Sequence, residues 1–355
     1  MKRFLLFFAA LLCCVSSFAQ MNFVATLQHN DSISHYYGQE ALNQAYTAAM
    51  DGDIITLSDG TFFADWAMET IMCKSLTIRG TAGTGGYTLI RHRNSNYNSI
   101  YIATRNKSLT TRFEGVCLLG RTYVINEDAQ FEKGKIEFIK CRISELYANA
   151  TGTPNTESPM VYVYNCIVDL FAFDNPLSYP KYNVVNSYVC NPRSRSDIGN
   201  NISIFEHCLI NYSNGVMSNG YNLNFTNCII TSKYNDSRYD YGCIFPTTTS
   251  VSNCLIVHNP YILNRSFSSA NNQFIDDIAS VFKTFNFSVG DGETFELTDE
   301  AKTTYLGNDS TQLGMYGGIA PYNTKMQYPV VTKLMPEPRT TKDGKLTIDV
   351  QVDGK

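Results

Sequence analysis

A short pattern of apolar and polar positions recurs along the chain, and LNFTNCII at residues 223–230 is one clear copy. We align the copies on the position of Cys228, which we call the slot. In every copy an apolar residue stands three positions before the slot and another stands two positions after it. A repeat of short apolar runs at this interval predicts a parallel β-solenoid. The slot is held by Val116, Cys141, Cys166, Ser187, Cys208, Cys228 and Cys254, at spacings of 25, 25, 21, 21, 20 and 26 residues.

The residue before the slot predicts a sharp bend. Residues two apart in a strand share a face, so the slot and the apolar residue after it point the same way. The apolar residue three before the slot shares that face only if the chain turns between them. This position is Gly115, Lys140 and His207 in three copies and Asn in the other four, and Gly and Asn tolerate the left-handed backbone of a bend. We therefore expect the slot residues to stack as a buried column inside a corner, about 4.8 Å apart.

These patterns predict an all-β, single-stranded parallel β-helix of about ten coils. Residues 38–50 have apolar positions at helical spacing and predict a short α-helix that caps the first coil. The β-helix is expected over 38–321, after a lead-in at 20–37. Residues 322–355 are expected to form a tail that packs on the solenoid or leads to an edge strand, and the stretch 345–352 alternates like one antiparallel strand.

The first residues predict a secretory signal peptide at 1–19. A basic start is followed by the apolar run Phe4–Val15 and by small residues before Gln20, the expected mature start. About twelve apolar residues are too few to cross ~30 Å of hydrocarbon, so no membrane span is expected. The protein is expected to be secreted, in the periplasm, at the cell surface or outside the cell.

Composition narrows the class of partner. The net charge is −4, which argues against nucleic acid as a partner, because such surfaces have a basic excess. The chain has 23 Tyr and 21 Phe but only 17% charged residues, a composition that favours strands.

The cysteines have two interpretations. Of the 11 in the chain, two lie in the leader, and the remaining nine are an odd number. Disulfides are plausible in a secreted protein. However, side chains stacked one strand spacing apart are slightly too distant for an unstrained bridge, which needs about 3.5–4.5 Å between Cβ atoms. We expect buried, unreactive thiols in the column, while Cys190 and Cys243 lie outside it and could still pair.

Three stretches carry a resemblance to a known family: ALNQAYTAAMDGDIITLSDGTF at 41–62, the recurring Asn-Cys phrase, and LGMYGGIAP at 313–321. Together they resemble the right-handed parallel β-helix proteins of the pectin-lyase-like kind, most of all the uncharacterised secreted ones common in Bacteroidales. The similarity spans roughly 38–321 and implies a right-handed coil. Because related folds include polysaccharide lyases and glycoside hydrolases, an enzyme has to be argued from residues and not from the fold.

A hydrolase of this kind needs two carboxylates facing each other across about 5–9.5 Å. Asp276-Asp277 is the only adjacent pair of Asp, and in a strand these side chains would point to opposite faces. We interpret the pair as solvated loop residues. Metal ligands are not predicted, since the acidic stretch 236–240 is only a weak calcium cluster. No cofactor is expected, although calcium is possible if the protein is a lyase.

A lyase needs a base beside a uronate. His92 and Arg93 lie in an irregular region and are weak candidates, together with the outward acids Glu114 and Glu137. A basic surface loop explains His92 and Arg93 equally simply.

The position after the slot should point outward, yet it is mostly apolar. This outward stripe comprises Cys117, Arg142, Ile167, Tyr188, Leu209, Ile229 and Leu255. Either a loop or a partner subunit covers it, or it binds a ligand, because exposed apolar patches mark interaction sites and aromatic faces suit sugar rings. The aromatic candidates for binding are Tyr162, Tyr164, Tyr188 and Tyr212.

Two functions follow from the sequence. The favoured one is a secreted or cell-surface β-helix protein that is non-catalytic and binds glycans or protein partners along a coil face. The alternative is a polysaccharide lyase or glycoside hydrolase acting on an acidic polysaccharide. Neither the ligand nor the oligomeric state can be predicted from the sequence.

Overall fold

The structure is a computed structural model of the chain. The signal peptide expected at 1–19 lies outside the described residues. The structure divides into two compact units, Met1–Thr324 and Lys325–Lys355. It describes residues 23–67, 70–81, 87–94, 99–104, 108–125, 134–149, 160–173, 181–190, 192–194, 203–212, 223–232, 249–257, 268–285, 295–323, 330–336 and 348–353.

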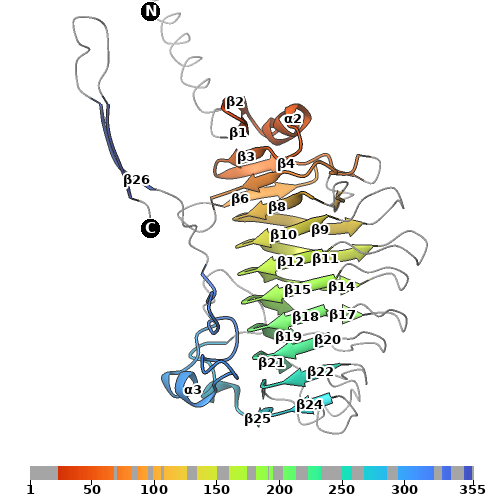
Figure 1. Ribbon diagram of the computed structural model, residues 1–355, viewed down its shortest axis with the longest axis vertical. Helices are drawn as coiled ribbons and strands as arrows, with labels where there is room; N and C mark the ends of the chain where they lie inside the picture. The colour runs from red at the N-terminus through yellow and green to blue at the C-terminus, as the bar shows by residue number, and fades with distance from the viewer. Residues whose placement is uncertain are drawn as a thin grey trace, which may run out of the picture. The chain divides into compact units, whose positions relative to one another are not determined.

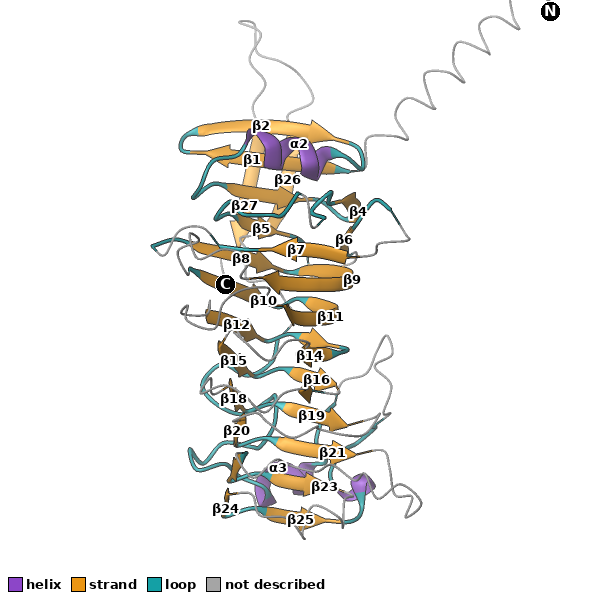
Figure 2. Cartoon of the chain, turned by 90° about the vertical axis from the view of Figure 1, so that its right-hand side faces the viewer, coloured by secondary structure: helices purple, strands orange, loops and turns teal. Residues whose placement is uncertain are grey.

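The first unit is a parallel β-solenoid, which confirms the predicted fold class (Figures 1 and 2). Two walls, ladder A and ladder B, stack strands in parallel register. Ladder A has the order β3 (Ile54–Leu57), β5 (Thr77–Arg79), β8 (Thr110–Glu114), β10 (Lys135–Ile139), β12 (Met160–Tyr164), β15 (Lys181–Val185), β18 (Ser203–Glu206), β20 (Leu223–Thr226), β22 (Ser250–Ser252) and β24 (Ser268–Ala270). Ladder B has the order β4 (Gly60–Phe63), β6 (Thr88–Arg91), β9 (Val116–Ile125), β11 (Arg142–Asn149), β13 (Ile167–Val168), β16 (Tyr188–Cys190), β19 (Leu209–Tyr212), β21 (Ile229–Ser232), β23 (Leu255–Val257) and β25 (Gln273–Ile275).

A third wall is described over only part of the stack. It consists of β7 (Ser99–Ile102), the second halves of β9 and β11, β14 (Phe171–Phe173) and β17 (Arg193–Ser194). The described solenoid therefore has about five turns in which all three walls are present. The prediction of about ten coils from the repeat was too high. In the later turns the segments that lead from ladder B back to ladder A lie largely outside the described residues.

The N-terminal elements differ from the repeat. Strands β1 (Val24–His29) and β2 (Ser32–Tyr37) form a hairpin, and β1 pairs antiparallel with β3. The predicted helix is α2 (Ala41–Ala48), which buries Ala41, Leu42 and Ala45 in the core. The ammonium group of Lys74 donates to the carbonyls of Tyr46 (2.6 Å) and Ala49 (2.8 Å) at the end of this helix, where a cation is favourable.

The bend before the slot is confirmed. In each of the seven aligned copies this residue has a positive φ, between 48° and 61°. Asn271 has the same conformation (φ 54°) and extends the column of corners by one coil. This extra coil was missed because Asn272, and not a cysteine, follows the corner.

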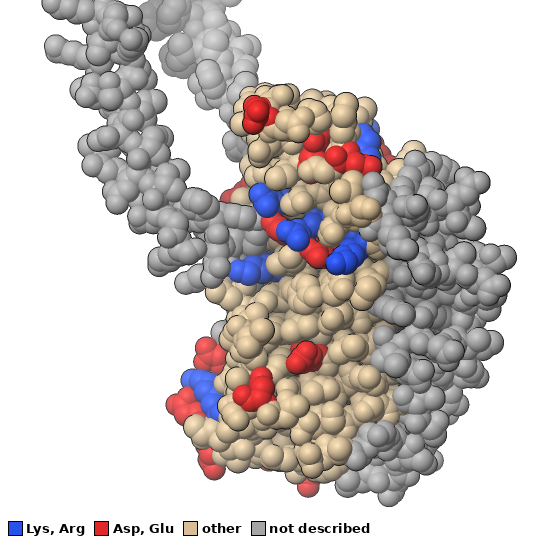
Figure 3. Space-filling view, viewed as in Figure 1, with Lys and Arg blue, Asp and Glu red and all other residues tan. Residues whose placement is uncertain are grey.

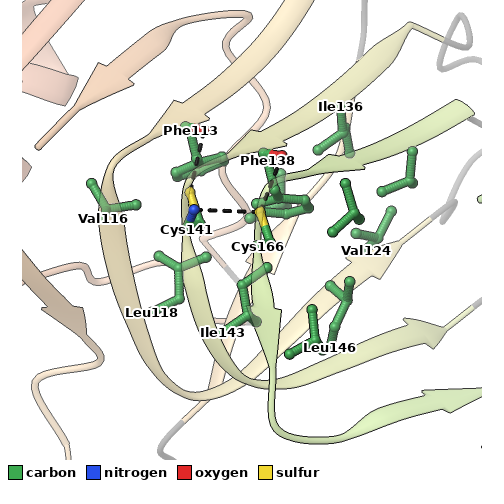
Figure 4. Packing of buried hydrophobic residues seen from close by; sticks show 14 of the residues in the cluster. Phe113, Val116, Leu118, Val124, Ile136, Phe138, Cys141, Ile143, Leu146 and Cys166 are labelled. Atoms are coloured by element: carbon green, nitrogen blue, oxygen red, sulfur yellow. Dashed lines mark hydrogen bonds between the residues drawn. The ribbon is translucent and has the colours of Figure 1, made fainter. Parts of the chain in front are cut away.

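The slot column is buried, and its side chains form a ladder of hydrogen bonds (Figure 4). The backbone N–H of Cys141 donates to the sulfur of Cys166 at 3.3 Å, and that thiol in turn donates to the carbonyl of Phe138 at 3.3 Å. The hydroxyl of Ser187 replaces the thiol in this ladder and accepts a hydrogen bond from the N–H of Cys166 at 3.0 Å. At the last coil the side chain of Asn272 accepts from Cys254 N at 2.9 Å. The slot therefore favours a small side chain that both donates and accepts.

The cysteines of the slot form no disulfide. Burial raises the pKa of the Cys166, Cys228 and Cys254 thiols, which keeps them protonated. Cys243, the expected possible partner of Cys190, lies outside the described residues.

The C-terminal part of the first unit contains a 3-10 helix, η2 (Ile278–Ser280), and α3 (Asp299–Thr304). The second unit is an antiparallel pair, β26 (Val330–Pro336) and β27 (Ile348–Asp353). The expected strand at 345–352 is thus present as β27, and it pairs within its own unit. Among the described residues no helix is both long and apolar enough to cross a membrane.

Candidate binding surface

From Tyr188 onward, the outward apolar stripe on ladder B is covered by the chain itself. We call residues 278–323 the C-terminal strap, of which 278–285 and 295–323 are described. Residues of the stripe and of the strap form a second hydrophobic cluster, separate from the core inside the coils. Its members include Tyr188, Leu209, Ile229, Leu255, Val281, Phe282, Phe295, Leu297, Leu313 and Met315.

Two of the predicted binding tyrosines are inaccessible. Tyr188 points out of the coil, but its exposure is 0% because Phe295 of the strap stacks on it, with ring centroids 4.6 Å apart. Tyr212 is 1% exposed and belongs to the core inside the coils. Its place four residues after the slot Cys208 puts it on the inward face of β19, as strand alternation requires. Neither ring is therefore accessible to a ligand in this structure.

Asparagines of the corner column fasten the strap. The side-chain amide of Asn186 donates to the carbonyls of Met315 (3.0 Å) and Gly317 (2.7 Å). Asn227 donates to the side chain of Asn308 at 2.8 Å. The corner residues therefore have a second role besides forming the bend, because their side chains bind a segment that is distant in the sequence.

His207 also holds the strap, through contacts of its ring with Asp309 and Gly317. Its Nε2 lies 2.9 Å from a carboxylate oxygen of Asp309, and a Cβ at Gly317 would collide with its ring. Burial alone would raise the pKa of Asp309. Hydrogen bonds from the backbone and hydroxyl of Thr311, together with the nearby His207, have the larger combined effect and lower this pKa. His207 does occupy the bend, as expected, and also anchors the strap.

The outward face of ladder A carries a chain of charged groups. Arg79 Nε donates to Glu114 at 2.7 Å, and Arg112 donates to Glu114 at 3.4 Å and to Glu137 at 2.7 Å. Burial acts to lower the pKa of Arg112, but the two carboxylates outweigh it and raise that pKa. Glu114 and Glu137 are therefore brought together, but each is paired with a guanidinium group.

Tyr162 and Tyr164 lie beside this charged chain, on β12. Their ring centroids are 5.7 Å apart, and the ammonium group of Lys135 lies 5.9 Å from the Tyr162 ring. Both rings are partly exposed. Burial, with smaller contributions from Tyr162 and Glu137, raises the pKa of Tyr164 to about 12, so its hydroxyl remains a hydrogen-bond donor at neutral pH.

The same face becomes less charged toward the C-terminal coils. Charged side chains gather over the N-terminal coils in Figure 3, and a mostly uncharged surface follows below them. On this part of ladder A, Met160 and Ile204 are exposed large apolar residues. In register with Tyr162 along the stack stand Asn183, Ile204 and Asn224. Ladder A thus presents an aromatic pair beside apolar and amide side chains.

His92 and Arg93 do not join this surface. They follow β6 of ladder B, whereas Glu114 and Glu137 lie on ladder A. Arg93 is paired with Glu40 and with Asp65, the latter at 2.8 Å. The nitrogen Nδ1 of His92 accepts from the backbone of Asn94 at 3.1 Å. The candidate base and the candidate acids thus belong to different walls.

In the adjacent pair Asp276-Asp277, the second residue caps a helix. Asp277 begins η2, and its carboxylate accepts from the backbone N–H of Ala279 at 2.9 Å. The acidic stretch at 236–240 lies outside the described residues. Where the structure does describe the chain, no three His, Cys, Asp or Glu side chains are placed to hold a metal ion.

A tyrosine stack on the third wall was missed from the sequence. Tyr101, Tyr123 and Tyr147 stack from coil to coil with centroids 4.8 and 5.0 Å apart, and the guanidinium of Arg121 lies 5.7 Å from the Tyr147 ring. Their spacing of 22 and 24 residues is close to that of the repeat, but Tyr123 and Tyr147 stand seven and six positions after their slot residues, because a bulge lies between, so alignment on the slot does not bring them into one column.

Comparison with protein-family models gave no match, and a search of curated proteins found no similar sequence. The class of protein is therefore defined by its architecture: an all-β parallel β-solenoid in which a strap covers the outward stripe of ladder B, while ladder A carries partly exposed aromatic rings on its outward face.

Proposed function

We propose that this protein is a secreted or cell-surface β-helix protein, without catalytic activity, that binds a glycan or a protein partner along the outward face of ladder A. The observation that carries the proposal is the contrast between the two ladders. The apolar stripe of ladder B is covered by the strap, whereas Tyr162 and Tyr164 on ladder A remain partly exposed.

The chemistry of ladder A supports a carbohydrate or a polar protein surface. Partly exposed aromatic rings offer apolar area to sugar rings while their hydroxyls donate hydrogen bonds. The amide side chains of Asn183 and Asn224 stand in register with Tyr162 in the following coils and can both donate and accept. Because coils repeat at about 4.8 Å, a linear partner lying along the stack would meet successive coils at regular intervals.

The finer features of the fold belong to the same proposal. The resemblance to pectin-lyase-like proteins supports a right-handed coil and export through the leader at 1–19. Helix α2 and the hairpin β1–β2 would cap the N-terminal coil, because a solenoid needs covered ends. The burial of Ala41, Leu42 and Ala45 supports this assignment for the helix.

The alternative, a lyase or hydrolase acting on an acidic polysaccharide, has weaker support. The arginines Arg79 and Arg112 could attract a uronate, but Glu114 and Glu137 already occupy them. His92 and Arg93 lie on another wall. An enzyme would thus need a constellation other than the one predicted from the sequence.

A binding and activity screen tests the proposal. Protein from Gln20 onward is offered a panel of plant, host and microbial polysaccharides with and without calcium, and affinity electrophoresis measures retention. The variant Tyr162→Ala/Tyr164→Ala is expected to weaken retention about tenfold, since aromatic contacts contribute about 0.5–1.5 kcal/mol each. Tyr101→Ala, which alters the third wall, is the matched control.

New reducing ends or unsaturated uronate in the same reactions would refute the non-catalytic assignment. Retention that the double variant does not change would refute the placement on ladder A. If no polysaccharide is retained, the same two variants are compared for capture of purified surface proteins.

A further inference from the structure

Strand β2 is the last strand at one edge of the sheet that contains ladder A. It pairs with β1 in an unbroken register from Val24↔Tyr37 to His29↔Ser32. No strand in the described part of the chain pairs with its other edge. Five of its six residues are exposed, including Ile33 at 63% and Tyr37 at 56%.

This edge lacks the features that usually prevent pairing with another chain. Exposed edge strands are normally short, bulged, or marked by Pro or Lys. The sequence of β2, SISHYY, contains no Pro and no Lys, and its pairing with β1 has no bulge. The strands β24 and β25 at the opposite end of the stack are only three residues long. Of the two strands that end this sheet, β2 and β24, β2 is therefore the better suited to accept another strand.

The backbone groups that face this edge can be identified. Gly38 N donates to Phe23 O at 2.8 Å, so this opposed pair is hydrogen-bonded. Because hydrogen-bonded pairs alternate along an antiparallel ladder, Tyr36, Ser34 and Ser32 bond to β1. Ile33, His35 and Tyr37 then direct their N–H and C=O groups to the open edge, and their side chains share one face.

We propose that β2 pairs with β2 of a second copy of this chain, antiparallel and about a two-fold axis at His35. In this register Ile33 faces the partner's Tyr37 and His35 faces the partner's His35, each as a hydrogen-bonded pair. The strand is self-complementary: an aromatic residue meets a β-branched one twice, a pair that stabilises sheets, and no fixed charge opposes the approach. A symmetric interface uses the same patch on both subunits, as this register does.

Cross-linking tests the register. Opposed residues of a hydrogen-bonded antiparallel pair have Cα atoms about 5.5 Å apart, within the range of about 4.4–6.8 Å that a disulfide needs. The variant His35→Cys is expected to give a covalent dimer on mild oxidation. In Ser34→Cys the two thiols would be diagonal, about 7–8 Å apart, and no cross-link is expected. A cross-link in Ser34→Cys but not in His35→Cys would overturn the register.

Sedimentation at a series of concentrations tests the association in the unmodified chain. We expect a monomer–dimer equilibrium that His35→Lys weakens at least tenfold, because two lysines would meet at the axis. Gln28→Lys adds the same charge to the same hairpin on β1 and is expected to change the equilibrium less than twofold. Melting curves of both variants establish that they fold.

A parent protein that stays monomeric at every concentration would overturn the proposal, as would a dimer that His35→Lys leaves intact. Hydrogen exchange distinguishes another cover of the edge. If the Ile33, His35 and Tyr37 amides are protected in a protein that sediments as a monomer, a segment of the same chain covers β2, and the second copy is excluded.

Discussion

Substitution of one slot cysteine by alanine tests the hydrogen-bond ladder inside the corner. Cys228 is fully buried, and its sulfur accepts from Cys208 N at 3.4 Å and donates to Phe205 O at 3.3 Å. Cys228→Ala removes the sulfur and leaves the Cys208 N–H without an acceptor in a site that water does not reach.

The expected cost is the sum of two effects. A buried donor left unsatisfied costs about 1–3 kcal/mol, and a cavity the size of a methyl group costs about 1 kcal/mol. We therefore expect Cys228→Ala to lower the free energy of unfolding by about 2–4 kcal/mol. Cys228→Ser keeps both a donor and an acceptor, as Ser187 does naturally, and should lower it by less than about 1.5 kcal/mol.

Urea unfolding under reducing conditions measures both variants against the parent. Because long repeat arrays can depart from two-state unfolding, hydrogen exchange at the Cys208 amide gives a local second measurement. Cys228→Ala should accelerate this exchange, and Cys228→Ser should not. Equal destabilisation by Ala and Ser would refute the reasoning, since only the packing of the sulfur would then matter.

Three further predictions concern thiols, acid and the first helix. Cys228 and Cys254 should react with Ellman's reagent at pH 8 only after unfolding, because burial raises the pKa of both thiols; labelling of the native protein at these positions would contradict this. Folding lowers the pKa of Asp309, so the ionised carboxylate stabilises the bound strap. This stabilisation is fully present above the ordinary carboxyl pKa of about 4, and it is lost as the pH falls through the lower pKa of the folded protein. Proteolysis of the strap should accordingly increase below about pH 4, and Asp309→Asn should already be cleaved faster at neutral pH. Lys74→Met should lower the free energy of unfolding by about 0.5–2 kcal/mol through the loss of the cation at the end of α2, with Lys135→Met as a control measured by the same urea titration.

The solenoid could be predicted because its signal repeats. Each copy brings an apolar position, a bend and a small slot residue to the same place, so seven weak signals add up. Even Lys140 and His207, which are unusual in the left-handed region, were placed at corners by alignment and not by residue type. The last corner, Asn271, was missed where the cysteine column ends.

The state of the surface could not be predicted in the same way. Tyr188 points outward as the alternation requires, but it is covered by Phe295, which lies more than one hundred residues later and outside any repeat. A segment of this kind carries no periodic signal. Tyr212 is different, since counting by two from Cys208 already places it inside, and a stricter use of alternation would have excluded it.

The direction of the strap has a consequence for how the molecule unfolds. Asn165 binds the backbone of Asn323, Asn186 that of Gly317, and Asn227 that of Gly314, so the strap runs back along the coils from later to earlier ones. In a simple solenoid each repeat contacts only its neighbours, and the terminal repeats can fray one at a time. Here His207 lies between Asn186 and Asn227 and contacts Asp309, so a single segment ties four successive corners together, and a coil near the C-terminal end can open only when contacts several coils away are released. The strap thus turns a stack of local units into one cooperative body.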